Sequence, residues 1–364
     1  MNGFCIGSEI YGEVFIFYTF CHKLTIVGVC VKSIFNGFLL EVRRFRISRS
    51  RVQRMDSPPH KKFKLQSTPA ELLSPIAVLD DEYYDEIEEV EVYVGVVLNK
   101  SYIGNLVQRL KTMLPMPDHL AHLKRVKGDE IILAAVKDSE KESCIEAVQK
   151  LEGLQTAIKV CKVSGKSPKT KEQHRQANQI WPCNFHPSKD VEKLLTGTFF
   201  QPEQVARQYE YMELALNVAK AKGALVGAVV VNPKSGEVIA TAHDERLRNP
   251  SNHAVMGVLE NVAAVQREFR DTEESKNAKE KDLPYLCTGY DLYVTREPCI
   301  MCAMAMIHSR VRRVFYGYES EFGALGTKCK IHTINALNHH YLVFKNILSN
   351  ECRILEKNDE ICVK

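Results

Sequence analysis

The feature that most constrains this chain is a histidine followed, much later, by a C-x-x-C pair: His253, then Cys299 and Cys302. One histidine and two cysteines are the ligand types of a zinc site with three protein ligands. Pro298 can start a helix at the cysteines, and Asn252 can cap a second helix that begins at the histidine. Unpaired N–H groups at such helix starts stabilise thiolates, the form that binds metal. The pattern therefore predicts two helix N-termini that direct three ligands at one zinc ion.

Two apolar segments flank this motif. Residues 225–231 precede the histidine and residues 310–317 follow the cysteines, and both have the composition of strands. With the P-C-x-x-C pattern, they make the chain resemble the cytidine and deoxycytidylate deaminase superfamily. The resemblance implies an α/β fold: a C-terminal cytidine-deaminase-like three-layer α/β/α domain, preceded here by a smaller domain. It also implies zinc as the cofactor, with His253, Cys299 and Cys302 as its ligands.

The chain departs from that superfamily at one position. The signature is H-x-E, and Val255 stands where the glutamate belongs. In the superfamily this glutamate is not a ligand; it moves the proton between zinc-bound water and the leaving ammonia. Valine cannot accept or donate a proton, and losing a positioned acid or base typically lowers a rate by about 10² to 10⁴. We therefore predict a metal site that lacks the catalytic group, and assign no catalytic residue.

A zinc motif without its glutamate, behind an extra N-terminal domain, resembles the non-catalytic subunit of the eukaryotic heterodimeric tRNA wobble-adenosine deaminase. The similarity extends over roughly residues 90–350. It implies a heterodimer with a catalytic partner that carries H-A-E and P-C-x-x-C motifs and converts wobble adenosine to inosine in tRNA. This chain would be the inactive subunit of that zinc-dependent hydrolase and would contribute tRNA binding and stability. We expect it in the cytoplasm and nucleus, without a membrane partner.

Length and composition are consistent with two globular domains. The chain has 364 residues, of which 45% are hydrophobic, and a formal net charge of +4. Domains usually contain about 100 to 200 residues. The weak net charge gives no argument for nucleic acid, so that argument depends on local clusters. The twelve cysteines have no dense spacing framework, which favours a reducing compartment over a disulfide scaffold.

The first 89 residues are assigned to two segments. Residues 1–54 are rich in Phe, Cys, Val and Ile and then in Arg, and we interpret them as an N-terminal extension. An over-extended gene model before a true start at Met55 and a mitochondrial transit peptide are both open. Residues 55–89 predict a disordered tail, first basic and then acidic. The acidic run, from Asp80 to Glu91, is interpreted as a solvated linker or as an electrostatic guard over a basic groove.

Residues 90–163 predict a ferredoxin-like α/β domain, to which the family resemblance assigns RNA binding. Its predicted elements are a strand at 92–98, a helix at 103–113, strands at 120–126 and 130–136, a helix at 145–151 and a strand at 158–163. This is the order β-α-β-β-α-β. The fold has many functions, so the order alone assigns none.

Residues 164–198 predict a basic linker. Ser164-Gly165-Lys166-Ser167-Pro168 is typical of linkers, and cations cluster around it. Such cations can neutralise phosphates without reading bases. A purely mobile linker stays open, and the resemblance favours RNA contact. The candidate RNA-binding residues are Lys159, Lys162, Lys166, Lys169, Lys171 and Arg175. Trp181 is predicted to pack at a domain boundary rather than to stack on a base.

Residues 199–350 are assigned to the zinc-binding deaminase-like domain. The predicted order is a helix at 205–219, strands at 225–231 and 238–242, the His253 helix, a charged loop at 270–282, and a strand at 290–295 before the cysteines. His332, His339 and His340 are predicted to be structural. The tail, residues 351–364, is a candidate cover for the zinc site.

Two other functions stay open at this stage. A self-sufficient nucleotide or base deaminase would need a relocated proton shuttle, and Asp244, Glu245 and Glu260 are the nearby carboxylates. Glu260 lies about 10 Å from His253 along the helix axis, which is too far for direct proton transfer. The second alternative is an RNA-binding scaffold with a purely structural deaminase domain. The sequence does not identify the bound tRNAs, the fourth zinc ligand or the heterodimer interface.

Overall fold

The computed structural model describes residues 72–138, 141–271 and 285–357. The predicted extension, residues 1–54, and residues 55–71 of the predicted tail lie outside these ranges. So do most of the predicted 270–282 loop and residues 358–364. Within the described ranges, no helix is long and apolar enough to cross a membrane.

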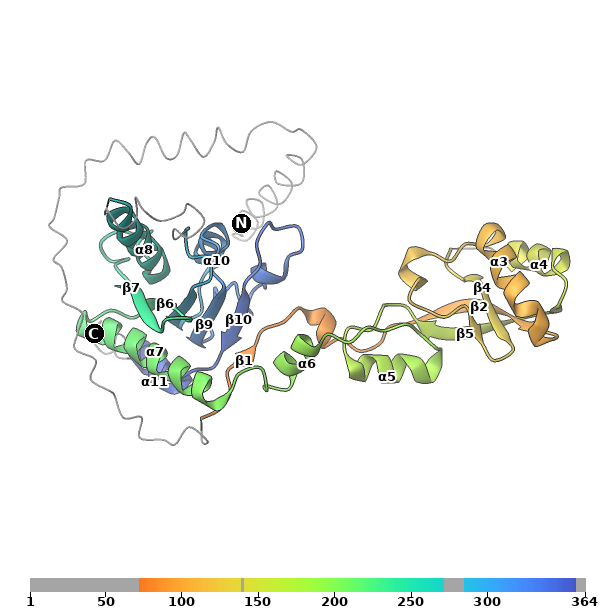
Figure 1. Ribbon diagram of the computed structural model, residues 1–364, viewed down its shortest axis with the longest axis horizontal. Coiled ribbons are helices and arrows are strands. Elements are labelled where there is room, and N and C mark those ends of the chain that lie inside the picture. Colours follow the sequence, from red (N-terminus) through yellow and green to blue (C-terminus); the bar gives the residue numbers. More distant parts are fainter. Residues whose placement is uncertain (1–71, 139–140, 272–284, 358–364) are drawn as a thin grey trace, which may run out of the picture. The chain divides into compact units, whose positions relative to one another are not determined.

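A six-stranded sheet forms the centre of the C-terminal part (Figure 1). Its strands lie in the order β1-β10-β9-β8-β6-β7. Strands β8, β9 and β10 are parallel, whereas β6 is antiparallel to β7 and β8, and β1 to β10. The strands are β1 (Ile76–Ala77), β6 (Gly227–Asn232), β7 (Glu237–His243), β8 (Asp291–Arg296), β9 (Arg313–Tyr318) and β10 (Leu342–Lys345).

Helices cover both faces of this sheet. α8 (Ala254–Arg270) and α10 (Ile300–His308) pack on one face, and α7 (Pro202–Ala221) and α11 (Ser349–Lys357) pack on the other (Figure 1). Successive residues of β6 point to opposite faces. Ala228 and Val230 join the core beneath α8 and α10, while Val229 and Val231 join the core beneath α7. The predicted three-layer α/β/α domain is confirmed.

Aromatic residues in register build the core beneath α7. Tyr293 lies opposite Phe315 in the parallel ladder, and Phe315 lies opposite Phe344. Their stacked rings have centroids 4.6 and 5.0 Å apart. Gly227 lets α7 approach the sheet, because a Cβ there would lie 2.0 Å from the carbonyl oxygen of Ala215.

The edge of the sheet is completed by residues that precede the N-terminal domain. β1 pairs with β10, and the N–H of Val78 donates to the carbonyl of Val343 at 2.9 Å. Nε2 of His332 lies 2.8 Å from the carbonyl oxygen of Val78. The prediction of a disordered tail is therefore wrong for residues 76–78. An edge strand presents unpaired backbone groups, and this segment satisfies them.

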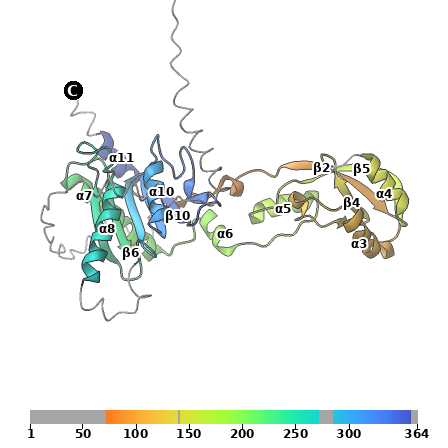
Figure 2. The same ribbon diagram turned by 90° about the horizontal axis from the view of Figure 1, so that it is seen from above.

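The N-terminal part contains a second, four-stranded antiparallel sheet in the order β3-β4-β2-β5. Its helices α3 and α4 pack on one face and α5 on the other (Figure 1, and from above in Figure 2). The chain order is β-α-β-β-α-β, so the predicted ferredoxin-like arrangement is confirmed. The elements are β2 (Glu89–Val97), α3 (Ile103–Met113), β3 (Val126–Lys127), β4 (Glu130–Ala135), α4 (Lys141–Lys150), β5 (Leu154–Ser164) and α5 (Lys171–Ile180).

Two predictions for this part need correction. The strand predicted at 120–126 is reduced to β3, because Leu120 and Leu123 are buried against the α5 face of the sheet instead of joining its ladder. The predicted linker contains α5 and α6 (Lys189–Leu195). α5 starts with a capping box in which Thr170 and Gln173 each bond the other's backbone N–H, a strong local helix signal.

Candidate metal centre

The two predicted ligand segments meet at one point. His253 is the N-cap residue of α8, Cys299 is the N-cap residue of α10, and Cys302 lies in the first turn of α10. α8 therefore begins one residue later than a cap at Asn252 implied, and α10 begins at Ile300, two residues after Pro298, which was predicted to start it. Both N-cap residues have extended backbone angles.

The three side chains have the geometry of a zinc site. Nδ1 of His253 lies 3.5 Å from Sγ of Cys299 and 3.5 Å from Sγ of Cys302. All three ligand atoms lie within 4.8 Å of one another. A tetrahedral zinc ion, with bonds of about 2.3 Å to sulfur and about 2.0 Å to nitrogen, would separate nitrogen and sulfur by about 3.5 Å. The donor set therefore fits zinc in both chemistry and spacing.

The two cysteines interact in a way that favours the thiolate form of Cys299. A hydrogen bond from Cys302 lowers the pKa of Cys299 to about 5, and the same bond raises the pKa of Cys302. Backbone N–H groups at the start of α10 also favour the Cys299 thiolate. Cys299 is thus the ligand that loses its proton more easily, and a bound metal ion would displace the proton that remains on Cys302.

Val255 lies inside the first turn of α8, two residues after His253. Its side chain is 3% exposed and belongs to the core beneath α8 and α10. Burial in this apolar core explains why a hydrophobic residue is stable there. It also leaves the centre without an acid or base at the position where the superfamily has its glutamate.

None of the alternative proton shuttles is among the residues that could hold the metal, although the charges of Asp244 and Arg246 lie close enough to influence the pKa of Cys302. Asp244 accepts hydrogen bonds from the guanidinium of Arg246 at 2.7 and 2.9 Å, and Glu245 pairs with His243 at 3.4 Å. The bond to Asp244 is the main reason why the pKa of Arg246 is raised. Glu260 is exposed. In the described ranges, the group that could hold a metal contains His253 and the two cysteines and none of these carboxylates.

Glu297 supports the cysteine segment, and sequence reasoning missed it. Its carboxylate is buried and accepts hydrogen bonds from the N–H groups of Ser320, Leu325 and Thr327 and from the Thr327 hydroxyl. A Cβ at Gly323 would lie 2.0 Å from this carboxylate, so the loop closes around it only with glycine there. The adjoining Pro298 carbonyl accepts from the N–H of Ala324 at 2.9 Å. The position of Glu297, two residues before Cys299 in the sequence Glu-Pro-Cys, was the feature that could have indicated its role.

The remaining histidines and the tail are not part of the centre. Nitrogens of His332, His339 and His340 lie within hydrogen-bonding distance of backbone carbonyl oxygens. α11 buries Cys352 and Leu355 in the core on the sheet face opposite α8 and α10. The described part of the tail, residues 351–357, therefore does not cover the metal centre.

Five of the six candidate RNA-binding cations form ion pairs. Lys159 pairs with Glu130 at 3.7 Å and Arg175 with Glu172 at 2.6 Å. The other three pair with residues of the acidic run: Lys162 with Glu89, Lys166 with Glu88 and Lys169 with Glu82, at 3.0 to 3.3 Å.

Trp181 is a core residue. It is 1% exposed, packs with α5 against the small sheet, and donates from Nε1 to the carbonyl of Lys124 at 2.7 Å. The predicted packing is confirmed, but Trp181 packs within the core of the N-terminal part instead of at a domain boundary.

Two family models match the chain. Residues 206–318 match the cytidine and deoxycytidylate deaminase zinc-binding region, and residues 90–181 match the N-terminal domain of the tRNA-specific adenosine deaminase TAD3. A Danio rerio protein named probable inactive tRNA-specific adenosine deaminase-like protein 3 is 36% identical, covering 78% of this chain and 94% of its own. The chain belongs to the TAD3 family.

Other proteins with similar sequences include a human protein, a yeast subunit and a chain of known structure. The Homo sapiens probable inactive tRNA-specific adenosine deaminase-like protein 3 is 36% identical over 77% of this chain and 91% of its own. The Schizosaccharomyces pombe tRNA-specific adenosine deaminase subunit tad3 is 28% identical over 62% and 73%. A solved chain from a study of A-to-I editing by tRNA:A34 deaminases is 29% identical, with a TM-score of 0.33, over 40% of this chain and 98% of that one.

Proposed function

We propose that this chain is the non-catalytic subunit of a tRNA adenosine deaminase that converts wobble adenosine to inosine. The observation that carries the proposal is a complete set of metal ligands beside a buried valine. Val255 takes the position of the superfamily's proton shuttle, so the centre can hold zinc but cannot transfer the protons that deamination requires. The names of the TAD3 relatives support the same assignment.

Zinc in this centre would be held by His253, Cys299 and Cys302. Its chemistry would be structural: a zinc ion tied to the starts of α8 and α10 contributes folding free energy. Glu297 would support the ligands by fixing the loop from Ser320 to Thr327 against the backbone that leads to Cys299.

The partner would be a catalytic subunit that carries H-A-E and P-C-x-x-C motifs. Because this chain lacks an acid or base at its own centre, activity requires one from another chain. Both subunits would work where tRNA is present, and we propose the cytoplasm and nucleus.

The N-terminal domain would bind tRNA. We propose that it extends from residue 90 to Trp181, because α5 and Trp181 complete its core. Lys159, Lys162, Lys166, Lys169, Lys171 and Arg175 are the proposed contacts. They are exposed, and lysine and arginine bind phosphate oxygens.

Deamination of a tRNA with adenosine at the wobble position tests this function. We expect no inosine from this chain alone, inosine from this chain together with its catalytic partner, and bound zinc in this chain. A partner whose H-A-E glutamate is replaced by valine is the control and should yield no inosine. Activity of this chain alone would instead support a self-sufficient deaminase, and no stimulation of an active partner would support a scaffold.

A further inference from the structure

Acidic and basic side chains face each other along two neighbouring segments of the N-terminal part. The three pairs have nitrogen–oxygen distances of 3.0, 3.3 and 3.1 Å. They join carboxylates before and at the start of β2 to lysines at the end of β5 and beyond. We call this group the clasp: Lys162–Glu89, Lys166–Glu88 and Lys169–Glu82.

The backbone of the clasp does not depend on these side chains. The β2–β5 ladder pairs Glu89 with Ser164, and the N–H of Gly165 donates to the carbonyl of Glu88 at 2.7 Å. The side-chain amide of Gln173 donates to the carbonyls of Glu82 and Asp85 at 2.8 and 3.0 Å. The two segments can therefore stay together while the charged side chains exchange partners.

The clasp pairs are easy to exchange because they are exposed. Their lysine side chains are between 47% and 68% exposed, and their glutamate side chains between 43% and 55%. Exposed ion pairs contribute about 0 to 1 kcal/mol each. A polyanion that offers several phosphates to the three lysines can replace the carboxylates at a small cost.

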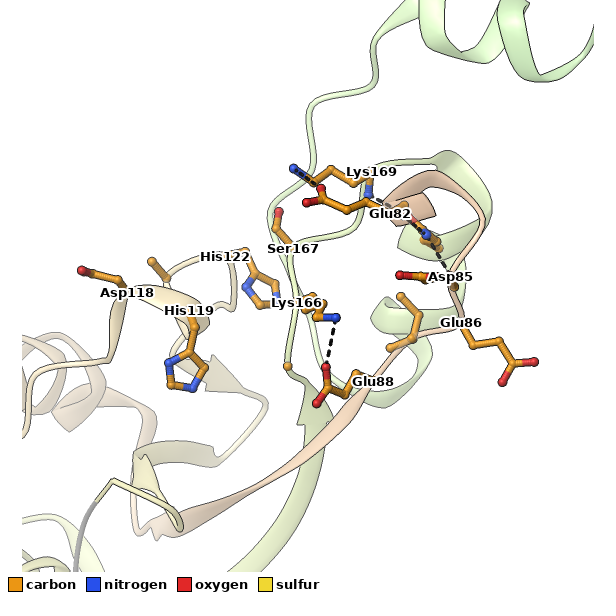
Figure 3. Close-up of a pocket in the computed structure, with 14 residues that line it drawn as sticks. Glu82, Asp85, Glu86, Glu88, Asp118, His119, His122, Lys166, Ser167 and Lys169 are labelled. Atoms are coloured by element: carbon orange, nitrogen blue, oxygen red, sulfur yellow. Dashed lines mark hydrogen bonds and ion pairs between the residues drawn. The ribbon is translucent and has the colours of Figure 1, made fainter. Parts of the chain in front are cut away.

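Two of the pairs border an open cavity of about 650 Å³ (Figure 3). Lys166 with Glu88 and Lys169 with Glu82 lie on its wall, and His119 and His122, from the stretch between α3 and β3, also line it. These two ion pairs therefore lie beside open space, where a phosphate backbone can approach the lysine ammonium groups.

We propose that the clasp is an exchange site for an RNA phosphate backbone. In the free protein, the lysines of the clasp form ion pairs with the carboxylates of Glu82, Glu88 and Glu89. When RNA binds, its phosphates displace these carboxylates from the lysines. The acidic run thus acts as a built-in competitor that weakens non-specific binding of polyanions. This inference rests on the proposed function, since it takes tRNA as the ligand.

The test is tRNA affinity of the complex formed by this chain and its catalytic subunit, measured at several KCl concentrations. The acid variant is E82Q/E88Q/E89Q, and the control, E142Q/E152Q/E203Q, removes the same charge from exposed acids elsewhere. We expect the acid variant to bind tRNA at least about threefold tighter than the control. Equal affinity of these two variants would overturn the proposal.

The lysine variant, K162M/K166M/K169M, completes the experiment. We expect weaker binding and a salt slope reduced by about 2, since each phosphate contact contributes about 0.7 to 0.9. Combining the acid substitutions with the lysine substitutions should not change tRNA affinity further, because the carboxylates then have no lysine with which to form an ion pair. An unchanged slope in the lysine variant would also overturn the proposal.

Editing by the unmodified complex is measured in parallel. If that complex binds tRNA but makes no inosine, the proposed function fails, while the affinity data still decide the clasp. If it makes inosine and the clasp variants bind like the control, the clasp fails and the proposed function stands.

Discussion

His332 should make this fold sensitive to mild acid. Burial lowers its pKa from the ordinary 6.5 to about 4. Its Nε2 bonds the carbonyl of Val78, and its Nδ1 is buried without a hydrogen-bond partner in the described part of the chain. A proton on Nδ1 would therefore be buried without an acceptor, so the folded state favours the neutral ring.

The sign and size of the effect follow from these pKa values. Between about pH 6.5 and pH 4, the unfolded chain holds a proton on this histidine that the folded chain lacks, so stability falls as the pH falls. For the two pKa values, linkage gives a loss of about 2 kcal/mol in the free energy of unfolding between about pH 7 and pH 5.

The variant His332→Gln isolates this contribution, because its amide can still donate to the carbonyl of Val78 but does not titrate. Urea unfolding followed by circular dichroism, at about pH 7 and about pH 5, gives the stability of each protein at both values. We expect the wild type to lose about 2 kcal/mol more than the variant over this range. Equal losses in the two proteins would refute the argument, whatever the stability of either at neutral pH.

Three further substitutions test the metal centre, the loop around Glu297 and the core of the N-terminal part. Cys299→Ser should lose zinc and lower Tm by at least about 5 °C, and a chelator should then have no further effect; retained zinc would contradict the ligand assignment. Glu297→Gln should cost about 3 kcal/mol in chemical unfolding, since an amide replaces a carboxylate that four donors bind; a cost below about 1 kcal/mol would show that the loop does not need the charge. Trp181→Phe should cost about 1 to 3 kcal/mol by leaving the Lys124 carbonyl without its donor, with tRNA affinity unchanged; weaker tRNA binding by the folded variant would restore a stacking role.

The metal centre was predictable because its chemistry is local. A C-x-x-C pair places two thiols in one helical turn, and the histidine begins the other helix, so the ligand types and their helix positions can be read from short stretches. The replacement of the signature's glutamate by Val255 concerns a single residue, so it can also be recognised in the sequence. The strand β6 and the order of elements in the N-terminal part were predictable for the same reason, since apolar runs and hydrophobic periodicity are local properties of the sequence.

The tertiary structure decided which distant residues meet. The lysines around β5 looked like a free basic cluster until the pairing of β2 with β5 placed Glu88 and Glu89 beside Lys166 and Lys162. Ion pairs depend on which strands are neighbours and on their register, and the strands β2 and β5 are far apart in the sequence. The loop around Glu297 and the pairing of β1 with β10 likewise depend on contacts between residues that are far apart in the sequence. The sequence by itself determined a zinc-binding deaminase fold without a proton shuttle; long-range backbone pairing determined which of its charges are available to a partner.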